Sequence, residues 1–415
     1  MRNFSKRDIF LLIANVIEHF DSALYSFLAP IMAPLFFPNH DPIVQIILAY
    51  SLLATSAFCR PLGAIIFGKC ARKYGPEFGL NLSLIGVSIG SIIMAIIPEY
   101  KEIGGMAPFL LIVVRVIKGI FGAGEGAIAK LYIIENKDLR LAYKASYLYQ
   151  GSSMVGSILA SAIAAFIVWS GEVYLWRMFF ALSGLIGCIV WCLRINILGS
   201  KYIARTRDLP MTKVPLKKYI MPMLAISFST GFSHMTYALP CIVMNSLVPL
   251  VCDITFAEMM QLNTFLIVLD MVLIFFCGPA LQKVSYKKNM LYSLALMILT
   301  IPFLFYLLPQ SSLVYVTFVR SWIILLGVIF MCPQNLFYSD ISAKLIPNYN
   351  KYLAVGIANA IGAGVIGKTI PAISMWIWYE TNNLLYIMCY IILLTIITFS
   401  LIYQIFAVSR QKSTP

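Results

Sequence analysis

The chain has 415 residues, of which 60% are hydrophobic and only 12% charged, and its formal net charge is +14. Soluble proteins carry about 25% charged residues, so this composition, with a mean hydropathy of +0.87, excludes a chain built from water-soluble domains. The apolar residues number about 250, close to the roughly 240 that twelve membrane-spanning helices of about 20 residues need. We therefore expect an all-α polytopic membrane protein with twelve transmembrane helices.

The first apolar run contains Glu18, His19 and Asp21 and has no small-residue cleavage site, which favours a retained span over a cleaved signal peptide. Apolar runs between polar or Gly- and Pro-bearing breaks predict twelve spans, at 9–37, 43–68, 79–97, 107–134, 145–169, 177–198, 219–250, 257–280, 290–308, 313–338, 353–378 and 383–408. The longest break is rich in Lys, Arg and Pro. It divides the chain into an N-terminal six-helix bundle (1–198), a cytoplasmic linker loop (199–218) and a C-terminal six-helix bundle (219–415).

Basic residues gather in the loops on one side of these spans. They precede span 1, follow spans 2, 4, 8 and 10, and fill the linker, whereas Lys101 is the only basic residue in the opposite loops. The positive-inside rule then predicts that both termini are cytoplasmic. The same loops account for most of the net charge, so we expect a lipid bilayer and no nucleic acid as the partner.

The two halves resemble each other in their loops. A basic loop follows the second span of each half, at 69–73 and 283–288. Such internal symmetry is typical of transporters built from parallel repeats. It predicts two pseudo-symmetric bundles that enclose a central site.

Eleven charged residues remain at membrane depth, where each costs at least a few kcal/mol unless it is paired or lines a wet cavity. They are Glu18, Asp21, Arg60, Arg115, Lys118, Glu125, Lys130, Arg177, Asp270, Arg320 and Lys368. Four of them lie nearer span ends, and we expect these to extend toward the membrane surface: Lys130, Arg177, Arg320 and Lys368. The mid-span residues are the stronger candidates for a binding site.

Span 1 carries Glu18, Asp21 and Tyr25 at i, i+3 and i+7, which places two carboxyl groups and a phenol on one helix face. Neighbouring carboxylates repel each other, a setting that suits reversible proton binding. The alternative is that these acids form structural ion pairs with Arg60 or Arg115. His19 lies on a different face, where it makes an ordinary polar contact or relays protons.

Span 4 places Lys118, Gly122 and Glu125 on one face and Arg115 with several glycines on a neighbouring stripe. The glycines allow close helix packing, but packing does not explain the charges. The cations could bind a carboxylate, and Glu125 could carry a proton.

Residues 362–369, GAGVIGKT, match the G-x-x-x-x-G-K-[ST] phosphate-loop pattern. That motif requires a preceding strand and an aqueous nucleotide, whereas this stretch lies within an apolar run. We expect a helix contact surface here instead. The nine cysteines have no ligand spacing, so the sequence predicts no metal, cofactor or disulfide.

Several motifs along the chain resemble those of the major facilitator superfamily, and within it the metabolite:proton symporter family of proline/betaine, citrate, oxoglutarate and shikimate permeases. NVIEHFD at 15–21 is similar to N-x-x-E-W-F-D, and RPLG at 60–63 matches R-P-L-G. GIFGAGE at 119–125 is similar to the end of Q-G-x-x-x-G-G-E, FFP at 36–38 to F-F-P, and WR at 176–177 to W-R.

The resemblance implies a monomeric rocker-switch carrier in a bacterial inner membrane that couples solute uptake to protons. Together with the span patterns, it nominates Tyr25, Arg60, Arg115 and Lys118 as substrate-binding residues and Glu18, Asp21 and Glu125 as proton-coupling residues. The chain departs from the family at its gate motif between spans 2 and 3, where Arg72 and Pro76 replace an acid and an arginine.

A cavity with charges of both signs suits a zwitterion or a small carboxylate, such as an amino acid, a betaine or an organic acid. The alternative within transport is a facilitator or exporter that does not respond to a proton ionophore. A polytopic membrane enzyme is disfavoured, because His19, His40 and His234 have no second ligand type at a useful spacing.

Overall fold

The structure is a computed structural model that describes residues 6–74, 76–133, 139–198, 219–281, 284–309, 311–346 and 351–411. All regular secondary structure in these ranges is helical. The predicted linker loop at 199–218 lies outside the described residues.

The first part of the chain, which we call the N half, contains seven long helices and one short one. They are α1 (Lys6–Phe36), α2 (Pro42–Phe58), α3 (Arg60–Tyr74), α4 (Pro76–Ile96), α5 (Tyr100–Ile103), α6 (Met106–Tyr132), α7 (Leu139–Ser170) and α8 (Leu175–Leu198). The second predicted span is thus two helices that meet at Cys59. Pro61, which has no backbone N–H to donate, lies at the start of α3 and explains the interruption.

The second part, the C half, contains two helices with a widened turn. Its elements are α9 (Ile220–Ala238), the π-helix η2 (Leu239–Val243), α10 (Met244–Leu247), η3 (Val248–Leu250), α11 (Phe256–Leu281), α12 (Tyr286–Tyr306), α13 (Leu313–Met331), α14 (Gln334–Leu345), α15 (Lys351–Ala360), the π-helix η5 (Ile361–Gly367), α16 (Lys368–Thr381) and α17 (Leu384–Gln411). Spans 7 and 11 each contain one of the π-helices.

Ten helical segments of the described chain are long and apolar enough to cross a membrane. The interrupted runs α2–α3 and α9–η3 lie between them and complete the twelve spans. The all-helical polytopic fold expected from composition is therefore confirmed. Most helix ends agree to within a few residues, as for the predicted span 177–198 and Leu175–Leu198. Three differ more: α3 ends at Tyr74 instead of 68, α7 begins at Leu139 instead of 145, and α14 ends at Leu345 instead of 338.

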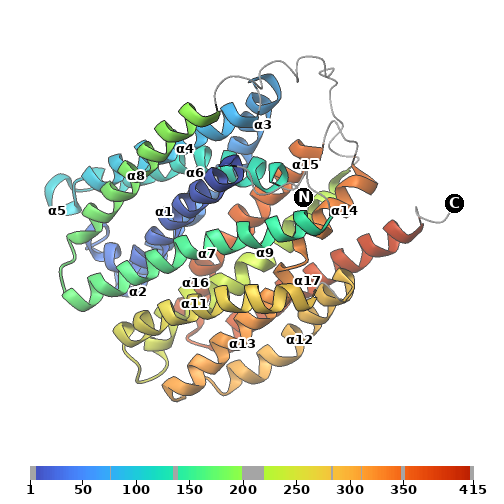
Figure 1. Cartoon of the computed structure of the whole chain (residues 1–415). Helices are drawn as coiled ribbons and strands as arrows, with labels where there is room; N and C mark the ends of the chain where they lie inside the picture. Colours follow the sequence, from blue (N-terminus) through green and yellow to red (C-terminus); the bar gives the residue numbers. More distant parts are fainter. Residues whose placement is uncertain are drawn as a thin grey trace.

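The helices of the two halves form two groups (Figure 1), and these groups pack on each other along two seams. In the N half, α1 packs against α7, and α4 packs against α6 and α8; in the C half, α12 packs against α13 and α17. Between the halves, α7 packs on α11, while α2 and α3 pack on α15, η5 and α16. α1 begins and α17 ends at the same end of the molecule.

Glycines bring backbones into direct contact inside each half. A Cβ added at Gly119 would lie 2.0 Å from the Ser56 carbonyl oxygen, and one at Gly156 would lie 2.3 Å from that of Val16. At two contacts between the halves, side chains meet instead. The Phe275 ring lies over Gly151, and the Tyr50 hydroxyl is 3.0 Å from that of Ser246.

Candidate functional site

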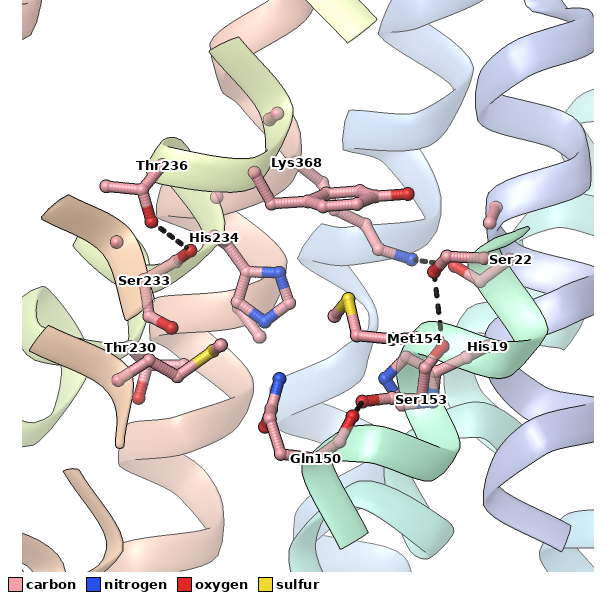
Figure 2. Close-up of a pocket in the computed structure, with 18 of the residues that line it drawn as sticks. His19, Ser22, Gln150, Ser153, Met154, Thr230, Ser233, His234, Thr236 and Lys368 are labelled. Atoms are coloured by element: carbon pink, nitrogen blue, oxygen red, sulfur yellow. Dashed lines mark hydrogen bonds between the residues drawn. The ribbon is translucent and has the colours of Figure 1, made fainter. Parts of the chain in front are cut away.

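A cavity of about 150 Å³ lies between the two halves and is lined by both of them (Figure 2). α1, α2, α3 and α7 contribute from the N half, and α9, η2, α11, α13, α14, α15, η5 and α16 contribute from the C half. Much of the lining can form hydrogen bonds, through hydroxyl, amide and imidazole groups: Ser22, Ser26, Ser153, Ser157, Thr230, Ser233, Thr236, Gln150, Gln334, Asn359, His19 and His234. A chamber with many hydrogen-bonding groups thus lies at the seam between the halves, where the intramembrane charges predict one.

Two charged residues from the N half face each other at the cavity wall. Arg60 Nη2 lies 3.4 Å from Glu18 Oε1, and both side chains are largely buried. The other Glu18 oxygen, Oε2, has no hydrogen-bond partner in the described part of the chain. A Cβ at Gly122 would lie 3.5 Å from Arg60 Nη2, an ordinary contact distance, so the pair lies against this turn of α6. Glu18 therefore has Arg60 as an ion-pair partner, and the pair borders the cavity.

Asp21 is held more tightly. Lys118 Nζ lies 2.7 Å from Asp21 Oδ2 and 2.8 Å from Oδ1, and both side chains are 4% exposed. The hydroxyls of Ser91 and Ser183 also donate to Oδ1. Asp21 therefore pairs with Lys118, neither with Arg60 nor with Arg115, and the pair borders a smaller cavity of about 20 Å³ beside the central one.

Arg115 packs against an aromatic ring. Its guanidinium carbon lies 4.0 Å from the centre of the Tyr25 ring, and Nη2 donates to Ser56 Oγ at 3.3 Å. The Tyr25 hydroxyl donates to the Ala49 carbonyl oxygen at 3.0 Å. Arg115 borders the smaller cavity, whereas Tyr25 lies behind it and is 1% exposed. A cation on an aromatic face gains about 0.5–2 kcal/mol, so Tyr25 positions Arg115.

Lys368 lies in the central cavity, so the expectation that it extends to the membrane surface is wrong. Its Nζ donates to Ser22 Oγ at 3.0 Å, a bond that joins the two halves (Figure 2). It borders both cavities. Lys368 is the first residue of α16, directly after the π-helix η5. The extra residue of that wide turn changes the face on which Lys368 lies by about 100°.

Asp270, on α11, also lines the central cavity and is 5% exposed. Neither an ion pair nor a hydrogen bond reaches its carboxyl group from the described residues. The C half therefore contributes one carboxyl group and one ammonium group to the cavity, those of Asp270 and Lys368.

Arg320 does not extend to the membrane surface either, because it is fully buried within the C half. It donates to the Pro240 carbonyl oxygen at 2.8 Å and to the side-chain oxygens of Asn245 and Asn263 at 2.9 and 2.6 Å. Pro240 belongs to η2, so Arg320 supplies a donor to an irregular turn. Arg320 is a structural residue and does not line the cavity.

Arg177 does lie near a span end, as expected. It donates to the carbonyl oxygens of Ala95 and Ile97 and pairs with Glu99, so it caps the C-terminal end of α4. Glu125 and Lys130 lie on α6, and Arg72 and Pro76 lie on α3 and α4, but these four side chains are outside the described ones.

The stretch that matches the phosphate-loop pattern forms η5 and the start of α16, inside the membrane-spanning segment. η5 packs on α9, where a Cβ at Gly362 would lie 2.2 Å from the Ser227 carbonyl oxygen. The glycines therefore serve helix packing, as the apolar context predicts.

Much of the cavity lining was not predicted, because its hydroxyl and amide groups carry no charge that marks them in an apolar sequence. Gln150, Ser153, Thr230, Gln334 and Asn359 are examples. His19 reaches the cavity as well, with Nδ1 donating to the Asn15 carbonyl oxygen at 3.0 Å. Figure 2 shows it facing His234 from across the seam.

Comparison with known proteins relates the whole chain to transporters. The chain is 26% identical over 417 residues to the proline/betaine transporter of Escherichia coli K12, covering 93% of this chain and 80% of that protein. It is 25% identical over 413 residues to a putative proline/betaine transporter of Staphylococcus haemolyticus, covering 97% and 87%.

Among solved structures, a D-xylose-proton symporter superposes with a TM-score of 0.69 at 13% identity, covering 98% of this chain and 97% of that one. The human organic anion transporter MFSD10 gives a TM-score of 0.66 at 12% identity, covering 96% and 100%. The sequence profile of the Major Facilitator Superfamily matches residues 11–368. This chain belongs to the Major Facilitator Superfamily.

Proposed function

We propose that this secondary transporter takes up a small zwitterionic or anionic solute and couples the uptake to protons by alternating access. The observation that carries the proposal is the central cavity, because both halves line it and four charged side chains border it: Glu18, Arg60, Asp270 and Lys368. The relatives named proline/betaine transporters support a small polar solute, and the proton symporter of the same fold supports coupling to protons.

Glu18 is the proton-coupling residue best placed to meet both the solute and water. It borders the cavity, its single ion pair is long at 3.4 Å, and its second oxygen has no partner in the described part of the chain. Protonation of Glu18 would release Arg60, which could then bind the solute or a neighbouring group. Asp21 shares two short contacts with Lys118, so this pair organises the wall behind Glu18.

Arg60 is the substrate-binding residue of the N half in this proposal, since it lies at the cavity. Lys118 and Arg115 line the smaller cavity behind it and contact Asp21 and Ser56, while the Tyr25 ring packs on Arg115. Glu125 remains a candidate for proton coupling on the basis of its sequence motif. The protein would act as a monomer in a cytoplasmic membrane.

The experiment is transport by the purified protein in proteoliposomes. Radiolabelled amino acids, betaines, mono- and dicarboxylates and sugars are offered under an inward proton gradient, with and without an ionophore. We expect accumulation of at least one zwitterion or anion, and its loss when the ionophore is added. Accumulation that ignores the ionophore would favour a facilitator, and the absence of any transport would reject the proposal.

A second arm of the same experiment uses Glu18→Gln. Coupled accumulation requires a group that binds and releases a proton, whereas exchange of labelled for unlabelled solute does not. We therefore expect this variant to lose accumulation and to retain exchange. Accumulation at the wild-type level would exclude Glu18 as the coupling residue.

A further inference from the structure

The charged residues that border the central cavity divide into a pair and two single charges. Glu18 and Arg60 neutralise each other at 3.4 Å. Lys368 and Asp270 have no oppositely charged group within 4.0 Å in the described part of the chain. The cavity therefore offers a solute one unmatched cation and one unmatched carboxylate, both from the C half.

Each of these two groups can accept another partner. The ammonium of Lys368 has three N–H donors, and its one hydrogen bond runs to Ser22 Oγ. The carboxyl group of Asp270 receives no hydrogen bond from the described residues, although the side chain is 5% exposed. A charge buried at membrane depth without a partner costs at least a few kcal/mol. A solute that pairs with both groups removes that cost at both.

A zwitterion is the class of solute that pairs with both single charges. A simple carboxylate would leave Asp270 without a partner, an amine would leave Lys368 without one, and an uncharged sugar would leave both.

The aromatic content of the cavity limits the kind of cation. A trimethylammonium group has no N–H to donate, and proteins bind it on the faces of aromatic rings. Among the lining residues of the described chain, the aromatic side chains are Tyr149 and Tyr237, with neither Trp nor Phe. Carboxylate oxygens only accept hydrogen bonds, so Asp270 favours a cation that carries N–H groups.

We infer that the cavity binds an amino or imino acid, with its carboxylate on Lys368 and its N–H-bearing ammonium on Asp270, and that it discriminates against the N-methylated quaternary form. This inference rests on the proposed function, because it names the solute class of the same cavity. It assigns the binding of both solute charges to α11 and α16.

The test measures exchange in proteoliposomes of the full chain. Each labelled amino or imino acid is compared with its fully N-methylated betaine, for example proline with N,N-dimethylproline. We expect at least one amino or imino acid to be exchanged, with an apparent affinity about tenfold or more above that of its betaine, the size expected for hydrogen bonds to a charged group. Equal or better exchange of the betaine would overturn the inference.

Variants separate the two charges. Asp270→Asn should lower the preference for an amino acid over its deaminated carboxylate about tenfold. Lys368→Gln should lower the affinity for both compounds, because both carry the carboxylate. Lys368→Arg should restore part of that affinity. The matched controls are Glu258→Gln and Lys344→Gln, which neutralise exposed residues outside the cavity and should exchange solute as the wild type does. An unchanged preference in a well-folded Asp270→Asn variant would contradict the assignment.

The outcomes separate this inference from the proposed function. If sugars or carboxylates are transported and no amino or imino acid is, the protein remains a transporter and the inference fails. If no solute is transported, both fail. If a variant does not fold, the comparison of each amino acid with its betaine in the wild-type protein still tests the inference.

Discussion

At the scale of single residues, the charges of the N half are arranged in pairs that differ in tightness. Glu18 meets Arg60 at 3.4 Å beside the cavity, whereas Asp21 meets Lys118 at 2.7 Å with both side chains 4% exposed. Sequence spacing placed these acids on one helix face correctly. It left their partners open, because which cation lies opposite depends on how α1, α3 and α6 are packed.

The buried pair makes a quantitative prediction. Removing one partner of a buried ion pair leaves the other charge without compensation, which costs about 3–5 kcal/mol. We expect Asp21→Asn to lower the free energy of unfolding by about this amount. The measurement is unfolding of the purified protein by denaturant or heat, followed by circular dichroism.

A double variant provides the control for this prediction. Asp21→Asn combined with Lys118→Met removes both charges, so much of the lost stability should return. If the double variant is as unstable as Asp21→Asn alone, or if the single variant is as stable as the wild type, the pair does not contribute as described.

One lysine and one arginine show that position along a span does not reliably predict where a charged side chain lies. Lys368 and Arg320 were expected to extend to the membrane surface, yet Lys368 borders the cavity and Arg320 is fully buried. Arg320 is held by carbonyl and amide oxygens that lie 57 to 80 residues away in the sequence. Such long-range partners leave no local signal in the sequence.

At the scale of helices, the spans themselves follow from apolar runs and were predicted almost completely. The π-helices η2 and η5 were not, because a single extra residue in a turn does not change the hydrophobic pattern. η5 determines which face of α16 carries Lys368. The face on which this cavity residue lies therefore depends on a feature that the sequence does not reveal.

The contact of α1 with α7 at Gly156 makes a prediction at this scale. A Cβ there would lie 2.3 Å from the Val16 carbonyl oxygen and 2.7 Å from the Phe20 nitrogen, and backbone atoms cannot move aside as side chains can. We expect Gly156→Ala to lower stability by about 1–3 kcal/mol, as overpacking does. Thermal unfolding in detergent measures the change.

The matched control for this substitution is Gly105→Ala. No atom lies within 4 Å of a Cβ built at Gly105, so this variant should unfold at the wild-type temperature. A Gly156→Ala protein that matches Gly105→Ala in stability would mean that the close approach of α1 and α7 is not required.

At the scale of the whole molecule, the number of spans and a central chamber followed from composition and intramembrane charges. The details of the chamber did not, because its neutral lining comes from helices that are far apart in the sequence. Orientation in the membrane is a prediction from the basic loops, and the structure adds that α1 begins and α17 ends at the same end.

Reporter fusions test that orientation in living bacteria. The positive-inside rule predicts that green fluorescent protein fused to the C-terminus fluoresces, because that end is cytoplasmic. Alkaline phosphatase fused after Lys101, in the opposite loop, should be active. A dark C-terminal fusion together with an inactive fusion at Lys101 would reverse the assignment.

The contrast between glycine contacts inside each half and side-chain contacts between the halves bears on how the transporter changes shape. Carbonyl oxygens pressed against glycine, as at Gly119 and Gly156, leave no freedom for sliding. The Phe275 ring on Gly151 and the Tyr50 hydroxyl on Ser246 can part by rotating single bonds. The activation barrier of the conformational cycle should thus arise mainly from separating a few mobile groups, while both halves keep their internal geometry throughout.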